Sequence, residues 1–521
     1  MAQQHHRRED EEEHRRDPGA GAGPELGGDA EISSLKTATT TTVMGNGNEQ
    51  VYNEKDYLVT WDHDDPANPL NWSAVYRGWL TFILGMLAMA ASLASSILSP
   101  ANPVLARYLG VSDEVVVLQV SLYVLGFCFG PSVWAPVSEV WGRRVSILPA
   151  MVGLAIFTVA TGVSKNAASV FVTRFFGGVF GSGPVSNVSA ALGDIWTREY
   201  RGIAVSFYAV AVVGGPTLGP VIGSALLVDP SLGWRWTMYI TAMFIGFIVV
   251  LSFFCFPEVS PPILLKRKAQ RLRKETGDNR YWHPQERIKI DVKSIVTKQF
   301  SRPLKMLLTE PMVAVIAFYA SFVFSILYLS LEAFPIAFAE MRGWSTVVSS
   351  MPFVASFVGI ICALVINIGN QPRYIRVSKA AGGRPVPEAR CPPMIIGGVL
   401  FLAGLFLFGW TAAPKYHWIL PIIGCAFIGA GFNSIFQQCI SFLVDTYGPY
   451  AASATAANTI LRSIFAAGLP LATRPMIRAI GLGSSMSILG AVATALVPVP
   501  ILFMRYGLAL RRQSKFAPVF E

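Results

Sequence analysis

Residues 312–338 read MVAVIAFYASFVFSILYLSLEAFPIAF, an apolar run in which Glu332 is the one charged residue. A helix needs about 20 predominantly apolar residues to cross a bilayer, so this segment is long enough to span a membrane. Segments of the same kind recur from Gly78 onward, separated by short polar or Gly/Pro-rich breaks. With 52% hydrophobic and 14% charged residues, the chain contains more apolar material than soluble domains bury. The sequence therefore predicts an all-α integral membrane protein.

The apolar segments form two sets of six, with one long polar connection between the sets. We predict the spans at 78–99, 115–137, 145–164, 169–191, 204–227 and 236–256, and then at 312–338, 346–368, 393–412, 418–444, 453–475 and 484–505. The chain then divides into a disordered tail (1–76), a six-helix bundle (77–256), a central loop (257–311), a second six-helix bundle (312–505) and a short tail (506–521). The first tail is polar, Gly-rich and Thr-rich, which is typical of disorder.

Lys and Arg residues concentrate on one side of the predicted membrane. They crowd the central loop, the loop at 369–392 and the carboxy-terminal tail, whereas the loops of the other side carry scattered basic residues such as Lys165 and Lys415. Because basic loops stay on the cytosolic side, we expect both termini and the central loop in the cytosol. This topology explains the net charge of +10 better than nucleic-acid binding does.

Motifs of cofactor or metal chemistry are missing from the sequence. The six cysteines show no CxxC pair or metal-ligand spacing, and His5 and His6 are a weak sign of metal binding beside plain solvation. Neither a GxSxG elbow nor an HExxH pair is present, and no GxxxxGK[ST] phosphate loop would serve an ATP-driven pump. We expect no enzymatic activity, no metal and no cofactor, with the proton gradient as the energy source.

Residues 130–144 read GPSVWAPVSEVWGRR and connect the second and third predicted spans. This segment resembles the loop signature of the major facilitator superfamily, whose fold is two six-helix bundles related by pseudo-two-fold symmetry. The resemblance implies a cytosolic latch made of Glu139, Gly142, Arg143, Arg144 and, after the fourth span, Asp194 as the partner of Arg143. Such charges stabilise the protein only in the conformation in which they are paired, and here they would favour the outward-facing state. Ordinary loop charge is the alternative.

Residues 215–223 in the fifth span read GPTLGPVIG. The segment looks like the antiporter signature of drug:proton exporters in the superfamily. Gly215, Gly219 and Gly223 share one helix face, which lets a neighbouring helix approach closely. Pro216 and Pro220 remove backbone donors and bend the helix. A packing motif without consequence for transport direction is the other interpretation.

Three further segments narrow the resemblance. They are DPANPLNW at 65–72, VDTYG at 444–448 with AASA at 451–454, and RQSKFAP at 512–518. Together they resemble fungal drug:proton antiporters with twelve spans, a group of multidrug, azole, polyamine and toxin exporters. The resemblance covers roughly residues 60–521.

A polar stripe of Ser321, Ser325, Tyr328 and Glu332 runs along the seventh span. We expect it to face a central cavity, because ionisable groups deep in hydrocarbon are costly unless they are paired or wetted. Burial favours the protonated form of a carboxyl group, so Glu332 could carry the coupling proton or attract a cationic substrate. It lies in the outer part of the helix, and a structural role at an extracellular gate is an equal alternative. The first span has no carboxylate, which strengthens the case for Glu332 and for the latch.

Other intramembrane polar residues are also candidates for proton coupling or substrate binding. Arg174 in the fourth span and Arg462 in the eleventh are the cationic ones, and either can instead direct its charge to the membrane surface. Asn433 and Gln437 form a stripe in the tenth span that can bind substrate or hold neighbouring helices.

These features predict a secondary carrier that exports small lipophilic toxic compounds, either external drugs or a metabolite of the same organism, in exchange for protons. A polyamine exporter is the second hypothesis, although a polycation needs more carboxylates than Glu332. A carrier-like receptor is a third and would be expected to have a longer signalling tail. We expect a monomer surrounded by lipid in the plasma membrane, with vacuolar and vesicular membranes as alternatives.

Overall fold

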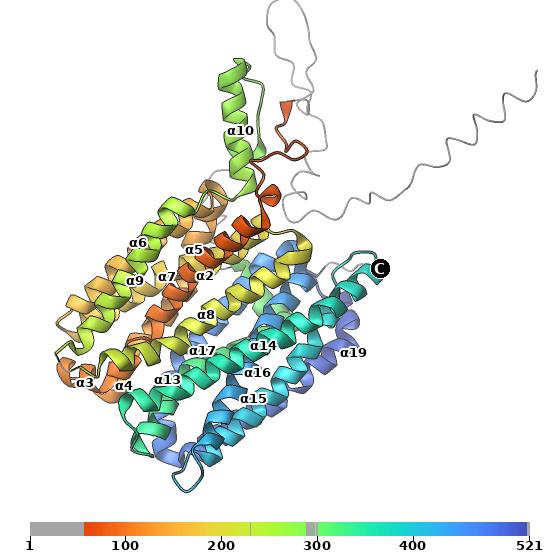
Figure 1. The fold of residues 1–521 in the computed structure, drawn as a ribbon. Helices are drawn as coiled ribbons and strands as arrows, with labels where there is room; N and C mark the ends of the chain where they lie inside the picture. Colours follow the sequence, from red (N-terminus) through yellow and green to blue (C-terminus); the bar gives the residue numbers. More distant parts are fainter. Residues whose placement is uncertain (1–56, 230, 288–296, 298–300, 518–521) are drawn as a thin grey trace, which may run out of the picture.

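A computed structural model describes residues 57–229, 231–287, 297 and 301–517 (Figure 1). The described residues are mainly helical, and their one β-bridge joins Leu58 to Trp282. The helices of the first half are α2 (Ala74–Ser96), α3 (Asn102–Leu109), α4 (Asp113–Val116), α5 (Leu118–Trp141), α6 (Arg143–Val163), α7 (Ala167–Ile195), α8 (Arg198–Leu226) and α9 (Gly233–Cys255). Two further helices, α10 (Pro261–Thr276) and α12 (Arg302–Thr309), lie in the region predicted as the central loop.

The second half repeats this pattern. Its helices are α13 (Pro311–Pro335), which continues as a π-helix (Ile336–Glu340), α14 (Thr346–Ala380), α15 (Cys391–Thr411), α16 (Ile419–Tyr447), α17 (Ala451–Ile480), α18 (Leu482–Leu496) and α19 (Pro498–Gln513). The last predicted span, 484–505, is divided into α18 and α19 at Pro498, because a proline starts a helix more readily than it continues one.

Ten helical segments of the described chain are long and apolar enough to cross a membrane. The other two predicted spans correspond to α7 and α17, which are 29 and 30 residues long and contain the buried Arg174 and Arg462. Large apolar side chains, including Phe247, Val250 and Phe254 of α9, are exposed on the outside of the bundle. An exposed apolar surface of this kind suits lipid rather than water.

The same helix pairs pack together in both halves. In the first half α2 packs against α8, α5 against α7 and α6 against α9; in the second half the equivalent pairs are α13 with α17, α14 with α16 and α15 with α18. The two halves meet where α8 contacts α14 and α5 contacts α17. The predicted fold of two related six-helix bundles is therefore confirmed.

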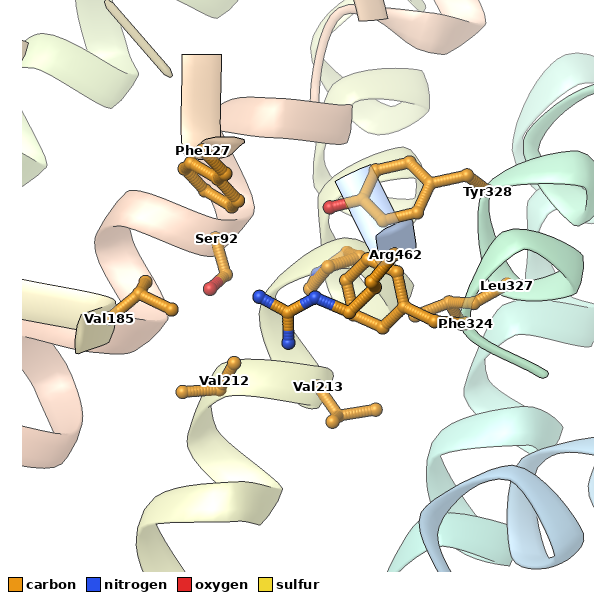
Figure 2. A pocket seen from close by; sticks show the side chains of 10 residues that line it. Ser92, Phe127, Val185, Val212, Val213, Phe324, Leu327, Tyr328 and Arg462 are labelled. Atoms are coloured by element: carbon orange, nitrogen blue, oxygen red, sulfur yellow. The ribbon is translucent and has the colours of Figure 1, made fainter. Parts of the chain in front are cut away.

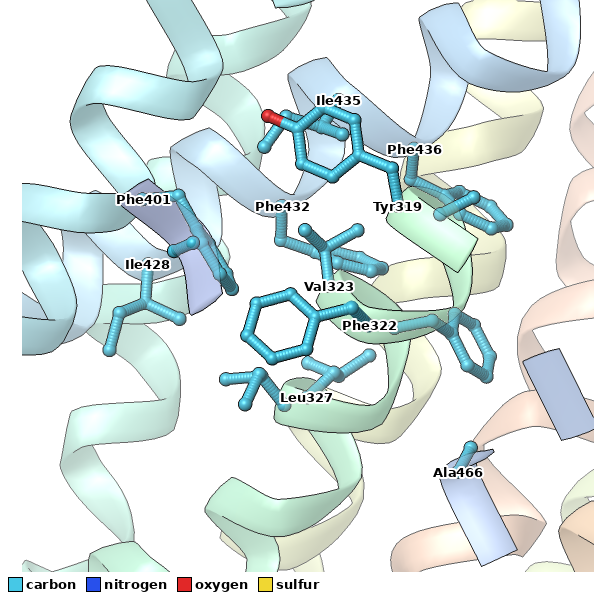
Figure 3. Close-up of a cluster of buried hydrophobic side chains, with 14 of the residues drawn as sticks. Tyr319, Phe322, Val323, Leu327, Phe401, Ile428, Phe432, Ile435, Phe436 and Ala466 are labelled. Atoms are coloured by element: carbon cyan, nitrogen blue, oxygen red, sulfur yellow. The ribbon is translucent and has the colours of Figure 1, made fainter. Parts of the chain in front are cut away.

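An aromatic core fills the second half between α13, α15 and α16 (Figure 3). The Phe432 and Phe436 rings are stacked with their centroids 5.6 Å apart, and Phe324 packs against both. Offset aromatic pairs add about 0.5–1.5 kcal/mol beyond the burial of their area. This core gives α13 a rigid support behind the interface between the halves.

The predicted disordered tail needs a correction at its end. Residues 1–56, which include His5 and His6, lie outside the described residues, but residues 57–73 have a defined structure against α10. The Lys268 ammonium forms ion pairs with Asp62 at 2.6 Å and Asp65 at 2.7 Å. Its hydrogen bond lowers the pKa of the Asp65 carboxyl below the ordinary value. The sequence pattern missed this contact because it joins segments about 200 residues apart.

Candidate functional site

A small pocket lies between the two halves, close to the middle of the long helices (Figure 2). The cavity has a volume of about 10 Å³, room for about one water molecule, whereas ligand pockets have volumes of ~300–1,000 Å³. Its lining comes from both halves and consists of Ser92, Phe127, Val185, Val212, Val213, Pro216, Phe324, Leu327, Tyr328 and Arg462. A drug-sized ligand therefore requires the two halves to move apart.

Tyr328 closes the pocket toward the end of the bundle that carries α3 and α4. Its hydroxyl lies 3.1 Å from the Ser95 hydroxyl of α2, a hydrogen bond between the two halves. Ser321 and Ser325 of the predicted polar stripe are buried too, but Ser325 donates to the Phe322 carbonyl of its own helix. Of that stripe, the structure therefore brings Tyr328 to the pocket.

Glu332 lies one turn beyond Tyr328 and does not line the pocket. Its side chain is buried and accepts hydrogen bonds from Asn102 at 2.8 Å and from Arg474 Nε at 2.7 Å. The Arg474 guanidinium also bonds Glu340 at 3.0 Å. Asn102 belongs to the first half and the three charged residues belong to the second, so the cluster fastens the halves together at the α3–α4 end. Sequence analysis missed Arg474, whose charge lies close to the predicted end of its span.

Gln437 joins the two halves nearer the end where α2 begins, and it is not part of the pocket lining. Its Nε2 donates to the Ser206 hydroxyl of α8 at 2.5 Å, and its Oε1 accepts from Asn367 of α14 at 2.7 Å. Asn433 instead donates to the Ile360 carbonyl at 3.1 Å, within the second half. The structure therefore places these two predicted residues in contacts between helices, and Gln437 joins the two halves.

Arg462 lines the pocket and has an unusual environment. Its guanidinium carbon lies 4.6 Å from the centre of the Phe324 ring and 5.3 Å from that of Phe436. Its Nε atom is buried without a hydrogen-bond partner. Figure 2 shows the guanidinium directed across the pocket toward Ser92.

Arg174 forms all of its hydrogen bonds inside the first half. Its guanidinium donates to the carbonyls of Gln119 at 2.9 Å, Ala94 at 2.6 Å and Ser95 at 2.6 Å, and it lies over the Tyr123 ring. These bonds fix the ends of α2 and α5 against α7. Three of the five N–H donors of Arg174 are therefore bound to backbone carbonyls, and the pocket lining does not include this residue.

The latch residues meet at the end of the bundle where α2 begins. Arg143 forms an ion pair with Asp194 at 2.8 Å and donates to the Ser138 hydroxyl at 2.7 Å. Gly142 has a φ of +104°, a conformation that favours glycine. A Cβ at Gly142 would also overlap the Glu258 carboxylate.

Glu258 takes the place that the resemblance implied for Glu139. The Glu139 side chain is exposed, and in the described part of the chain it forms no ion pair, whereas Glu258 accepts from the backbone N–H groups of Arg143 at 2.9 Å and Arg144 at 3.2 Å. A carboxylate at this point satisfies free donors and the dipole at the start of α6. Arg144 donates to the Phe253 carbonyl at 2.6 Å.

Comparisons with known proteins agree with this architecture. A family model described as "Major Facilitator Superfamily" matches residues 84–470. The chain belongs to the major facilitator superfamily. It is a multi-pass membrane protein of a transporter family.

Relatives in the superfamily cover most of the chain. The chain is 34% identical to "Major facilitator superfamily multidrug transporter FLU1" of Candida albicans, over 94% of this chain and 82% of the relative. It is 38% identical to "Citrinin biosynthesis cluster MFS transporter mrr1" of Monascus ruber, over 94% of this chain and 99% of the relative. The predicted resemblance to fungal exporters is thus confirmed at the level of the family.

Among solved structures, the xylose transporter XylE from E. coli in a partially occluded inward open conformation has a similar fold. The TM-score is 0.59 and the sequence identity 16%, over 83% of this chain and 98% of XylE. At this identity the similarity concerns the fold alone.

The segment at 215–223, which resembles the antiporter signature, lies on α8, and its three glycines face α2. A Cβ at Gly215 would lie 2.6 Å from the Leu93 backbone nitrogen, and a Cβ at Gly219 would lie 3.0 Å from that of Ile97; Gly223 faces the Ile97 carbonyl. The helix runs through Pro216 and Pro220 without interruption, and Pro216 reaches the pocket. Close packing of α2 on α8 thus explains the glycine spacing.

We expect Gly215→Ala to lower stability by about 1–3 kcal/mol, because the added methyl group must displace the α2 backbone. The matched control is Gly246→Ala on α9, where nothing lies within 4 Å of the added Cβ and replacement of a helical glycine gains about 0.5–1 kcal/mol. The apparent melting temperatures of the two purified variants measure the difference. Equal shifts would contradict the packing role.

The second half contains an equivalent latch that sequence analysis did not predict. Arg390 precedes α15 as Arg143 starts α6, and it forms an ion pair with Asp445 of α16 at 2.9 Å. Arg511 pairs with Glu388 at 2.7 Å nearby. The sequence could have indicated this pair, because Arg390 and Asp445 occupy the positions in the second half that Arg143 and Asp194 occupy in the first.

Proposed function

We propose that this protein exports small lipophilic compounds across a membrane by alternating access. One observation carries the proposal, namely a pocket at the interface of two similar six-helix halves. Hydrogen bonds join the halves on both sides of this pocket, through Tyr328 toward one end and Gln437 toward the other. A carrier of this architecture works by rocking the halves about a central site, and breaking either set of contacts opens one access path.

The pocket lining favours apolar substrates. Seven of its ten residues are valine, proline, leucine or phenylalanine, with Ser92, Tyr328 and Arg462 as the polar exceptions. Lipophilic ligands bind to such surfaces, while a few polar groups set their orientation. The relatives named as a multidrug transporter and as a transporter of a citrinin biosynthesis cluster support the same substrate class.

The charge in the pocket argues against polyamine export. A polycation requires carboxylates, but the lining contains an arginine and no acidic residue. Glu332 is held outside the pocket by Arg474 and Asn102. The site therefore repels the very charge that a polyamine carries.

Protons are the proposed energy source, and Glu332 is the proposed coupling group. Protonation would remove the charge that binds Arg474 and weaken a contact between the halves, which links proton binding to opening of the α3–α4 end. Each proton moving down ~100 mV releases ~2.3 kcal/mol. The protein needs no nucleotide or metal for this cycle.

The proposed orientation places both termini in the cytosol of the cell. Basic residues gather at the end of the bundle where α2 begins, on α10 and the end of α19, and positive segments are retained on the cytosolic side. Glu332 and Arg474 then lie at the outer gate, and Arg143 and Asp194 lie at the cytosolic latch. We place the protein in the plasma membrane as a monomer.

Cellular accumulation tests this function. We expect cells that make the wild type to retain less Nile red and 1-naphthaleneacetate than control cells, and a protonophore to abolish the difference. Glu332→Gln should lose export while its amount at the membrane stays normal. Lower retention of spermidine alone would favour the polyamine hypothesis, and unchanged retention of every compound would contradict export.

A further inference from the structure

We infer that the central pocket is selective for lipophilic weak acids in their anionic form, with Arg462 as the residue that binds the acid group. This inference rests on the proposed function, because it names the substrate class of the same pocket. The anion would be a carboxylate or a comparable oxyanion attached to an apolar or aromatic body.

The charge of Arg462 lacks a counter-ion in the described part of the protein. Its side chain is 8% exposed, and the ionisable groups that interact with it are the hydroxyls of Tyr328 and Tyr208 and the thiol of Cys128. None of these is a carboxylate. Burial of a guanidinium without a paired anion is costly, so a purely structural role does not explain an arginine at this position.

Other buried arginines of this chain show how a structural arginine is satisfied. Arg174 donates to three backbone carbonyls, and Arg474 and Arg390 are paired with carboxylates. Among the described residues, Arg462 instead lies over the faces of Phe324 and Phe436 and has no paired carboxylate. Aromatic faces attract a cation, but they accept none of its N–H donors as strongly as an anion does.

A second unpartnered polar group faces the same space. Ser92 Oγ and Arg462 Nε are buried and have no hydrogen-bond partner among the described residues, and the two side chains lie across the pocket from each other (Figure 2). An oxyanion between them would accept from the guanidinium and from the hydroxyl together. The apolar part of the ligand would then contact Phe127, Val212 and Leu327.

This arrangement predicts discrimination between an acid and its ester. A neutral ester fits the apolar walls equally well but leaves the buried guanidinium unpaired, and sites built for a polar group discriminate strongly against analogues that lack it. Weak acids also need such a carrier. They enter a cell in the uncharged form, ionise at cytosolic pH, and then cross the bilayer poorly.

Binding of 1-naphthaleneacetate and its methyl ester to the purified full-length protein tests the inference. At pH 7 we expect the wild type to bind the acid at least tenfold more tightly than the ester. Arg462→Gln should reduce this ratio to below threefold, mainly because the variant binds the acid more weakly. Arg462→Lys should retain part of the preference for the acid. Arg505→Gln, on the exposed face of α19, is the control and should keep the wild-type ratio.

The outcomes separate the inference from the proposed function. Equal affinity of the wild type for acid and ester would overturn the inference, and this comparison does not depend on the folding of any variant. An unchanged acid preference in a folded Arg462→Gln protein would overturn it as well. If cells export Nile red but binding shows no acid preference, the inference alone fails. If acid binds preferentially but no compound is exported, the proposed function alone fails.

Discussion

Arg474→Met is expected to destabilise the protein by about 3–5 kcal/mol, the usual effect of removing one partner of a buried ion pair. The Arg474 side chain is 12% exposed and joins Glu332 to Glu340. Without it, Glu332 keeps the hydrogen bond from Asn102 but must either carry an unpaired buried charge or take up a proton. The same substitution removes an ion pair that holds α13 against α17 within the second half, so export should fall with stability.

Arg478→Met is the matched control, one turn further along α17. Its side chain is 61% exposed and pairs with Glu114 at 2.8 Å, and exposed pairs contribute only about 0–1 kcal/mol. Apparent melting temperatures of the purified variants compare the two positions. The double variant Arg474→Met with Glu332→Met should recover stability relative to Arg474→Met alone, because no charge is left buried. A similar small shift for Arg474→Met and Arg478→Met would refute this assignment.

Arg143→Gln should lower the rate of export at least tenfold while the amount of protein in the membrane stays near the wild-type level. Arg143 bonds Asp194 and Ser138 at the end of the first half where α2 begins, and both it and Asp194 are largely shielded from water. Loss of this contact changes the balance between conformations, and a bias of about 1.4 kcal/mol corresponds to a tenfold change in population.

Asp194→Asn removes the same ion pair and should have a similar effect, with little further loss in the double variant, because residues in one contact are not additive. Glu139→Gln is the control. The Glu139 side chain is exposed, so this change should leave the rate of export unchanged. Initial rates of loss of preloaded 1-naphthaleneacetate from cells measure the series. If Glu139→Gln lowers the export rate as much as Arg143→Gln does, the assignment of the latch to Arg143 and Asp194 is wrong.

The fold could be predicted from the sequence because hydropathy alone marks helices that cross a bilayer. The main errors lie outside the spans, where hydropathy carries no signal. Residues 57–73 and α10 are polar, yet the ion pairs of Lys268 give them a defined arrangement. The break before α19 was indicated by Pro498, but the apolar run on both sides concealed it.

The candidate site was only partly predictable. Helix periodicity placed Tyr328 on a polar face, and both Tyr328 and Arg462 line the pocket. Arg174 and Arg462 were selected as charged residues inside predicted spans, and this position does not show which neighbours a side chain meets. The pairing of Glu332 with Arg474 joins residues 142 positions apart, and such a pairing has no signal in the pattern of a single helix.

The most direct test of proton-driven export uses inside-out membrane vesicles that contain the protein. Nile red and 1-naphthaleneacetate are added outside, and the lumen is made acidic relative to the medium. We expect at least one of these compounds to enter the lumen faster than in vesicles without the protein, and a protonophore to remove the difference. An acidic lumen draws weak acids outward passively, so inward movement of 1-naphthaleneacetate would be especially informative. Uptake that is the same with and without the gradient would contradict proton-coupled export.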